Sequence, residues 1–98
     1  MPAYIIVNVT INDPVEYEAY KKLTPASLVA FDGKFIVRGG ETEILEGNPT
    51  VGRMVVLAFP DAARARQWWH SEDYREAKSI RQRVAYTEMI LVEGVSEP

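Results

Sequence analysis

Apolar and polar positions alternate along residues 3–11 (AYIIVNVTI) with the two-residue period of a β-strand. Most of these residues are β-branched or aromatic, and such side chains favour strands. One face of the predicted strand is apolar throughout: Ile5, Val7, Val9 and Ile11. The other face is mixed, with Tyr4, Ile6, Asn8 and Thr10. We therefore expect both faces of this strand to be covered.

A helix is predicted to begin directly after this strand. Asp13 is a suitable N-cap, and Pro14 suits the first helical position. The apolar stripe then recurs at spacings of three and four: Tyr17, Tyr20, Leu23 or Thr24, Ser27, Leu28 and Phe31. Pro25 lacks the N–H that a helix interior uses, and Thr24 before it resembles a new cap. We expect a kink, or a second short helix from Pro25 to Phe31.

Two more strands are predicted in the middle of the chain, over residues 34–40 (KFIVRGG) and 52–59 (GRMVVLAF). Gly39-Gly40 is expected to end or bend the first of them. The residues between them, 41–49 (ETEILEGNP), place a short apolar pair among acidic residues and end in Gly-Asn-Pro. This composition is typical of a solvent-exposed segment. It predicts an exposed hairpin arm or an edge segment.

The last third of the chain predicts two capped helices and a strand. Pro60-Asp61 ends the third strand and caps a helix over residues 62–70. Ser71 is predicted to cap the next helix through its hydroxyl, because two acidic residues follow in the first turn. That helix carries Tyr74, Ala77 and Ile80. Residues 84–93 (VAYTEMILVE) form the final strand.

This order of elements predicts a single ferredoxin-like α+β domain over residues 1–98, with the pattern βαββαβ and a four-stranded antiparallel sheet. Such a sheet has its helices on one face. The opposite face of the predicted strands is also apolar or mixed, as Met54, Val56 and Ala58 illustrate. Because a bare apolar sheet is a large exposed patch, we expect two copies to stack sheet against sheet as a homodimer.

Composition excludes several classes of protein. The 98 residues carry a formal net charge of −3, which offers no general attraction to nucleic acid or to anionic lipid. The chain has no cysteine, which excludes disulfides and thiol chemistry, and a single histidine, which argues against a metal site. No apolar run approaches the roughly 20 residues of a membrane span, and the first ten residues lack a basic leader. We expect a cytoplasmic protein with no membrane partner and no cofactor.

The RNA-recognition domain has the same topology and stacks bases on aromatic residues of its sheet. The third predicted strand, GRMVVLAF, has no aromatic residue in its interior. The sequence therefore does not predict a nucleic-acid partner.

Residues 68–83 (WWHSEDYREAKSIRQR) hold the side chains most typical of an active site, and two interpretations compete. His70 could be a general base, since its ordinary pKa lies near neutral pH. The same segment could instead be a packed corner between two helices. Trp68 and Trp69 are about 100° apart on a helix, so they cannot both face inward. We assign Trp68 to the core and Trp69 to a cleft or its rim.

The order and spacing of several short strings resemble a small bacterial family, domain of unknown function 1330. The strings are RGG at 38–40, LEG at 45–47, FP at 59–60, WWHSEDYREA at 68–77, Arg81, and LVEGV at 91–95. The resemblance implies a dimeric α+β barrel, a fold group that includes cofactor-free monooxygenases and stress-linked barrels. Those monooxygenases use an Asn-Trp-Arg arrangement, for which Asn8, Trp69 and Arg38 are equivalents in residue type only.

The candidate site is a cleft between sheet and helices, near Tyr20, Arg38, Trp69 and Tyr74, with His70 as the candidate catalytic residue. Asn8 is a further candidate ligand-binding residue. For Arg38, an ion pair with Glu88 or Glu43 is the main structural alternative. Two functions remain open. One is a small homodimeric protein that binds a small aromatic or acidic molecule, as a cofactor-free enzyme of monooxygenase or isomerase type. The other is a non-catalytic ligand-binding or stress-associated dimer.

Overall fold

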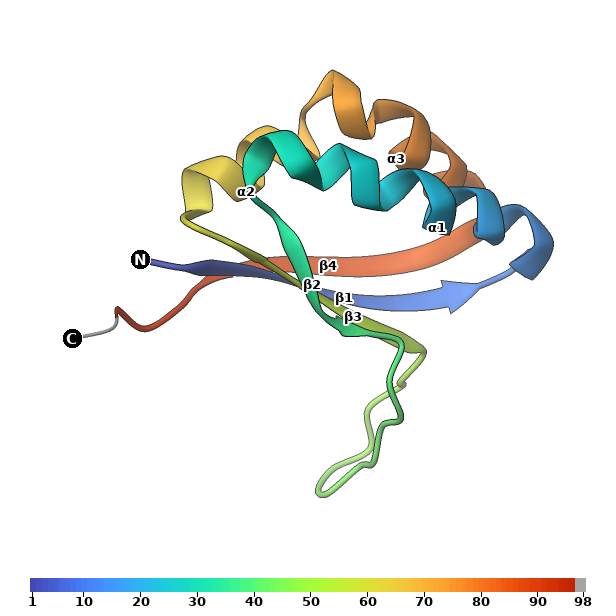
Figure 1. Ribbon diagram of the computed structural model, residues 1–98. Coiled ribbons are helices and arrows are strands. Elements are labelled where there is room, and N and C mark those ends of the chain that lie inside the picture. The colour runs from blue at the N-terminus through green and yellow to red at the C-terminus, as the bar shows by residue number, and fades with distance from the viewer. Residues whose placement is uncertain (97–98) are drawn as a thin grey trace.

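Figure 1 shows the computed structural model, which describes residues 1–96. Strands and helices follow one another in the predicted order, with a helix pair in the second half. Their bounds are β1 Ala3–Ile11, α1 Pro14–Leu28, a 3₁₀ turn Val29–Phe31, β2 Lys34–Arg38, β3 Arg53–Phe59, α2 Ala62–Trp69, α3 Glu72–Val84 and β4 Ala85–Glu93.

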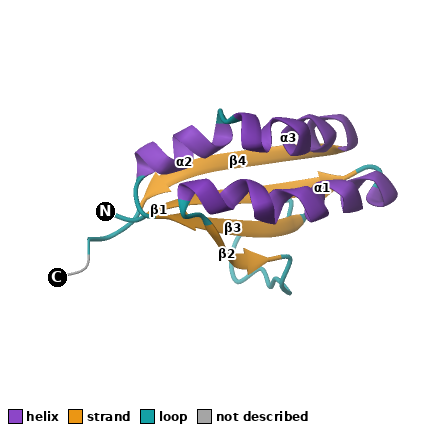
Figure 2. Cartoon of the chain, turned by 45° about the horizontal axis from the view of Figure 1, so that its top comes forward, coloured by secondary structure: helices purple, strands orange, loops and turns teal. Residues whose placement is uncertain are grey.

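The four strands form one antiparallel sheet in the order β2-β3-β1-β4. The helices lie on one face of this sheet, where α1 runs beside α3 and α2 continues the line of α3 (Figures 1 and 2). The predicted ferredoxin-like α+β fold is therefore confirmed. Strand β2 ends at Arg38, directly before the Gly39-Gly40 pair that was expected to end or bend it, and Gly39 turns the chain with a φ of 72°.

The core lies between the helices and the inner face of the sheet. Alternate residues of β1 are buried there, namely Ile5, Val7 and Val9. Trp68 of α2 and Tyr74 of α3 are both fully buried, and their rings stack with centroids 3.9 Å apart. Burial of such large aromatic surfaces is a major source of stability in a chain of this size.

The outer face of the sheet has no covering layer within residues 1–96. Val37, Val56, Ile6 and Ile90 pair with one another across all four strands and form a single apolar row over this face. Ile6 is 37% exposed and Ile90 is 62% exposed. We call this surface, with Tyr4, Met54, Ala58 and Val92 beside the row, the open face.

Residues 41–51 form the predicted exposed arm between β2 and β3. In Figure 1 the arm projects from the sheet on the side away from the helices. Ile44 and Leu45 near its tip are 51% and 84% exposed. At its base, the Asn8 side chain donates to the Thr50 carbonyl (2.9 Å) and accepts from the Gly52 N–H (2.8 Å). Asn8 thus fixes the point at which the arm rejoins the sheet.

The Trp-Trp-His-Ser segment forms the corner between α2 and α3. Trp68 is buried as predicted, and its indole N–H donates to the Ser27 hydroxyl of α1 (3.0 Å). Ser71 is the N-cap of α3: its hydroxyl accepts from the Tyr74 N–H (3.1 Å) and donates to the Trp68 carbonyl (2.7 Å). Both predictions are confirmed. His70 ends α2 and is exposed.

The alternative of a second short helix from Pro25 to Phe31 was wrong, because α1 continues through Pro25 to Leu28. A proline at this position leaves the carbonyl of Lys21, four residues earlier, without its helical N–H partner. The Arg38 guanidinium of β2 donates to that carbonyl at 3.0 Å. A side chain from the sheet thus supplies the hydrogen bond that Pro25 removes.

The expected ion pair of Arg38 with Glu88 or Glu43 was also wrong. Glu88 lies on β4, at the opposite edge of the sheet from β2, and on the open face rather than the inner face. Glu43 lies in the exposed arm. Arg38 instead binds the Lys21 carbonyl and stacks over the Phe35 ring, 4.2 Å from its centroid.

None of the helices within residues 1–96 combines the length and the apolar character that crossing a membrane requires.

Replacing the buried tryptophan of the corner should be far more destabilising than replacing its histidine. Trp68→Ala should lower the free energy of unfolding by about 3 to 5 kcal/mol, because it leaves a large cavity and removes a stacked ring. His70→Ala should change it by no more than about 0.5 kcal/mol. Urea unfolding at one protein concentration measures both, and equal losses would contradict the corner interpretation.

The bond between Arg38 and α1 predicts coupling with Pro25. Arg38→Met should cost about 1 kcal/mol in the parent protein, because the Lys21 carbonyl loses its donor. In the Pro25→Ala variant the new N–H can bond that carbonyl, so the same change should cost close to nothing. A double-mutant cycle of unfolding free energies tests this, and an equal cost in both backgrounds would show that Arg38 does not compensate for Pro25.

Candidate functional site

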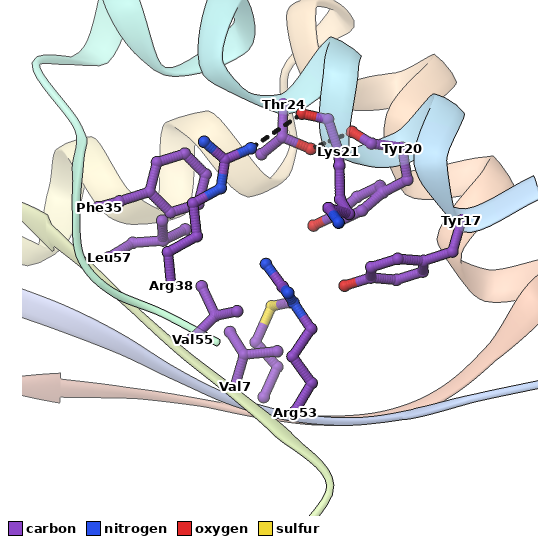
Figure 3. A pocket seen from close by; sticks show the side chains of 11 residues that line it. Val7, Tyr17, Tyr20, Lys21, Thr24, Phe35, Arg38, Arg53, Val55 and Leu57 are labelled. Carbon is purple, nitrogen blue, oxygen red and sulfur yellow. Dashed lines mark hydrogen bonds between the residues drawn. The ribbon is translucent and has the colours of Figure 1, made fainter. Parts of the chain in front are cut away.

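A cavity lies between α1 and the inner face of the sheet, beneath the middle of the helix (Figure 3). It contains about 380 Å³ of space between atoms, part of it open to solvent. Only about 20 Å³ of this space admits the centre of a water-sized sphere, which is room for about one water molecule, so a larger ligand requires the lining side chains to move apart. Its lining residues are Val7, Tyr17, Tyr20, Lys21, Thr24, Phe35, Arg38, Arg53, Val55, Leu57 and Met89.

The charged side chains of this lining are all cationic: Lys21, Arg38 and Arg53. No aspartate or glutamate is among the lining residues. Lys21 pairs with Glu18 on the exposed side of α1 (3.0 Å), and the Arg38 guanidinium donates one hydrogen bond to the Lys21 carbonyl. Within residues 1–96, neither arginine of the cavity forms an ion pair. The cavity is therefore electrostatically suited to an anion.

Arg53 is the most unusual of these cations. It reaches from the sheet into the space beneath α1 (Figure 3), and its Nε is buried without a hydrogen-bond partner among the described residues. Its guanidinium lies 6.0 Å from the centre of the Tyr17 ring. A Cβ on Gly39 would lie 2.5 Å from one of its terminal nitrogens. The first glycine of the RGG string thus makes room for Arg53 as well as turning the chain.

Two tyrosine hydroxyls also point into this space, those of Tyr17 and Tyr20 (Figure 3). Tyr20 shares a hydrogen bond with Tyr74 (2.8 Å between the two hydroxyl oxygens). The Nε of the buried Arg81 donates to the Tyr74 hydroxyl (3.2 Å). Burial is the main cause that raises the pKa of each of these three tyrosines. Their hydroxyls are therefore neutral at physiological pH.

The structure brings together only part of the predicted site. Tyr20 and Arg38 line the cavity, and Tyr74 lies one hydrogen bond behind Tyr20. Asn8 is on the β1 face opposite to Val7, where it holds the base of the arm. These residues therefore do not share one cleft with Trp69 and His70, because Asn8 lies on the other side of the sheet and neither Trp69 nor His70 lines the cavity.

Trp69 and His70 make contacts within the α2–α3 corner rather than with the cavity. The ammonium group of Lys78 lies 3.8 Å from the Trp69 ring centre and donates to the Trp69 carbonyl (2.9 Å). His70 meets the edge of the Trp69 ring, with centroids 4.9 Å apart, and its backbone N–H bonds to Arg66. Neither residue lines the cavity under α1.

Sequence reasoning missed Arg53, Tyr17 and Arg81 as site residues. A signal existed for Arg53, because alternation along β3 places it on the same face as Val55 and Leu57, where a charge requires a reason. Arg81 carried a similar signal, since it falls seven residues after Tyr74 on the inward face of a helix. The sequence pattern indicated that Tyr17 is a core aromatic residue, and its side chain is buried.

No group of three or more metal-binding side chains lies close together within residues 1–96.

Solved structures of similar shape are known. A protein of unknown function from Rhodopseudomonas palustris, RPA0582, has a TM-score of 0.76 with 19% identity, over 98% of this chain and 84% of that one. SnoaB, a cofactor-independent oxygenase from Streptomyces nogalater, has a TM-score of 0.66 with 14% identity, over 98% and 95%. An antibiotic biosynthesis monooxygenase has a TM-score of 0.54 with 12% identity, over 98% and 100%. The shared fold is that of the dimeric α+β barrel group.

A search among curated proteins found no match to the sequence. The family model of the domain of unknown function DUF1330, in contrast, matches residues 2–95. The match covers nearly the whole chain, and the protein therefore belongs to the DUF1330 family.

Proposed function

We propose that the cavity under α1 binds a small anionic aromatic molecule. The observation that carries this proposal is the buried, unpartnered Arg53 Nε in a cavity whose lining has cations and no carboxylate. Arg53 as a whole is half-buried, but its Nε is withdrawn from solvent, and a charged donor in that position is costly to leave without an acceptor. A bound anion would provide one.

The rest of the lining suits a ring attached to the anionic group. Most of the wall is apolar: Val7, Phe35, Val55, Leu57 and Met89. The polar groups lie on the α1 side and at Arg53. Ligand sites commonly combine an apolar wall with a few polar groups that fix the orientation.

Catalysis of the monooxygenase or isomerase type is the first form that this function can take. The likeness to a cofactor-independent oxygenase suggests it, and a site that holds a negative oxygen can also stabilise an enolate or phenolate that forms during a reaction. A cavity with this lining would act by stabilising charge, because its lining has no aspartate, glutamate or histidine to remove a proton.

Non-catalytic ligand binding is the second form, and the same lack of a proton acceptor in the lining favours it. Turnover distinguishes the two. Consumption of a bound phenol or enol under air, monitored by mass spectrometry, would favour an enzyme, whereas tight binding without chemical change would favour a binding protein.

We also propose that the protein is a homodimer formed through the open face. The apolar row of Val37, Val56, Ile6 and Ile90 is the kind of surface that a second copy covers. The arm projects on the same side, with Leu45 exposed near its tip, so it would contact the second copy. The shared fold group supports this arrangement.

Affinity for aromatic acids should depend on Arg53. We expect benzoate, salicylate and para-nitrophenolate to bind, and the neutral amides of the two acids to bind at least 10-fold more weakly. Arg53→Met should weaken binding of the acids by about 10- to 100-fold, because it removes a charge-assisted hydrogen bond. Isothermal calorimetry measures these affinities.

The matched control for this experiment is Arg66→Met, which removes an exposed arginine of α2 from outside the cavity. It should leave the affinities unchanged. If no acid binds to the parent protein, or if Arg53→Met and Arg66→Met have the same effect, the cavity is not an anion site.

The open face should control assembly. We expect the parent protein to be a dimer that buries at least about 1,200 Å². Ile90→Glu places a charge in the apolar row and should produce monomers at micromolar concentration. Val15→Glu, at an exposed apolar position of α1, should remain dimeric. Light scattering coupled to size-exclusion chromatography reports the mass, and a monomeric parent protein would refute the proposal.

A further inference from the structure

Arg81 is buried, with 5% of its surface exposed, yet within residues 1–96 it has no carboxylate partner. Its Nε instead donates to the Tyr74 hydroxyl, at 3.2 Å. A guanidinium has donors only and stays charged at all physiological pH values. The oxygen of Tyr74 must therefore accept this hydrogen bond.

The Tyr74 hydroxyl proton then needs an acceptor of its own. Tyr74 is fully buried, and the Tyr20 oxygen at 2.8 Å is the acceptor that the described residues offer. If Tyr20 donated instead, the Tyr74 proton would be buried without an acceptor, which costs about 1 to 3 kcal/mol. The bond therefore runs from Tyr74 to Tyr20.

This direction leaves the Tyr20 proton free for the cavity that Tyr20 lines. In a chain of hydrogen bonds, each bond polarises the next, and a positive charge at one end makes the donor at the other end stronger. Burial also keeps Tyr20 in its neutral form, because it raises the pKa of that hydroxyl. Tyr20 is thus suited to donate a hydrogen bond and unsuited to act as a base.

We propose that Arg81 is a positioning residue that acts through Tyr74 to orient the Tyr20 hydroxyl as a donor toward the oxyanion of an aromatic ligand. The inference rests on the proposed anion site and specifies its chemistry. The ligand is recognised through a phenolate, enolate or carboxylate oxygen that lies between the Tyr20 hydroxyl and Arg53. A ligand whose only polar group is a donor has no acceptor for the Tyr20 proton.

The test uses para-nitrophenol, a phenol that titrates near neutral pH and turns yellow when it ionises. In the parent protein, stabilisation of the phenolate should lower the pKa of the bound dye relative to the free dye. The bound dye should therefore be yellow at a pH at which the free dye is still largely colourless. Absorbance titration at saturating protein measures this pKa directly.

Three variants interrupt the series of hydrogen bonds from Arg81 through Tyr74 to Tyr20 at successive points. Tyr20→Phe removes the donor and should raise the pKa of the bound dye by roughly one unit relative to the parent protein. Tyr74→Phe and Arg81→Met leave the Tyr20 hydroxyl in place and should raise it by a smaller but measurable amount. Arg81→Lys keeps a charged donor and should restore part of the shift. Arg75→Met, an exposed arginine of the same helix, is the control and should change nothing.

The outcomes separate the two proposals. If Tyr20→Phe raises the pKa of the bound dye while Tyr74→Phe and Arg81→Met leave it unchanged, the role of Arg81 is refuted and the anion site stands. If the parent protein binds no dye, or binds it with the pKa that it has in solution, the anion site fails and this inference fails with it. Should Arg81→Met not fold, Tyr74→Phe tests the same chain alone, because it keeps the ring that stacks on Trp68.

Discussion

A guanidinium that is withdrawn from water needs a counter-charge, and residues 1–96 provide no carboxylate partner for Arg81, which is buried, or for Arg53, which is half-buried. Arg81 is satisfied in part by a tyrosine hydroxyl, and Arg53 by the face of the Tyr17 ring. Arg53 adds its charge to a small, largely apolar cavity, and Arg81 lies behind that cavity, linked to it through Tyr74 and Tyr20. The proposed ligand class follows from this imbalance more than from any single residue.

The fold holds these charges in place through a few specific contacts. Stacking of Trp68 on Tyr74 fixes the α2–α3 corner and with it the hydroxyl of Tyr74 next to Tyr20. Pro25 leaves a free carbonyl on α1, and Arg38 binds it, which ties β2 to the helix over the cavity. The corner that most resembles an active site in the sequence thus has a supporting role, and the cavity lies elsewhere.

The open face lies on the side of the sheet opposite the helices. Helices cover one face of the sheet, and the opposite face presents an apolar row that crosses all four strands. Asn8 and Gly52 hold the arm at the border of this face, where a Cβ on Gly52 would lie 2.2 Å from the Val9 carbonyl oxygen. The proposed dimer would therefore leave the cavity on the helix side accessible from solvent.

Most of the fold was predictable because alternation and capping are local signals. The period-two pattern of β1 and the cap at Ser71 both appear in the structure as predicted. The site was less predictable because it depends on contacts between distant elements. Pro25 looked like a helix break, since the compensating Arg38 comes from another strand. The candidate site included Tyr20 and Arg38 correctly but added Trp69 and His70 because of their residue types, whereas the cavity combines α1 with all four strands.

The most direct test of the account is a crystal structure of the protein with a bound aromatic acid such as salicylate. We expect the carboxylate to lie within hydrogen-bond distance of the Arg53 guanidinium and the Tyr20 hydroxyl, with the ring against Val55 and Leu57. A ligand bound instead at the Trp69–His70 corner, or a cavity that stays empty while the acid is present at saturating concentration, would contradict it.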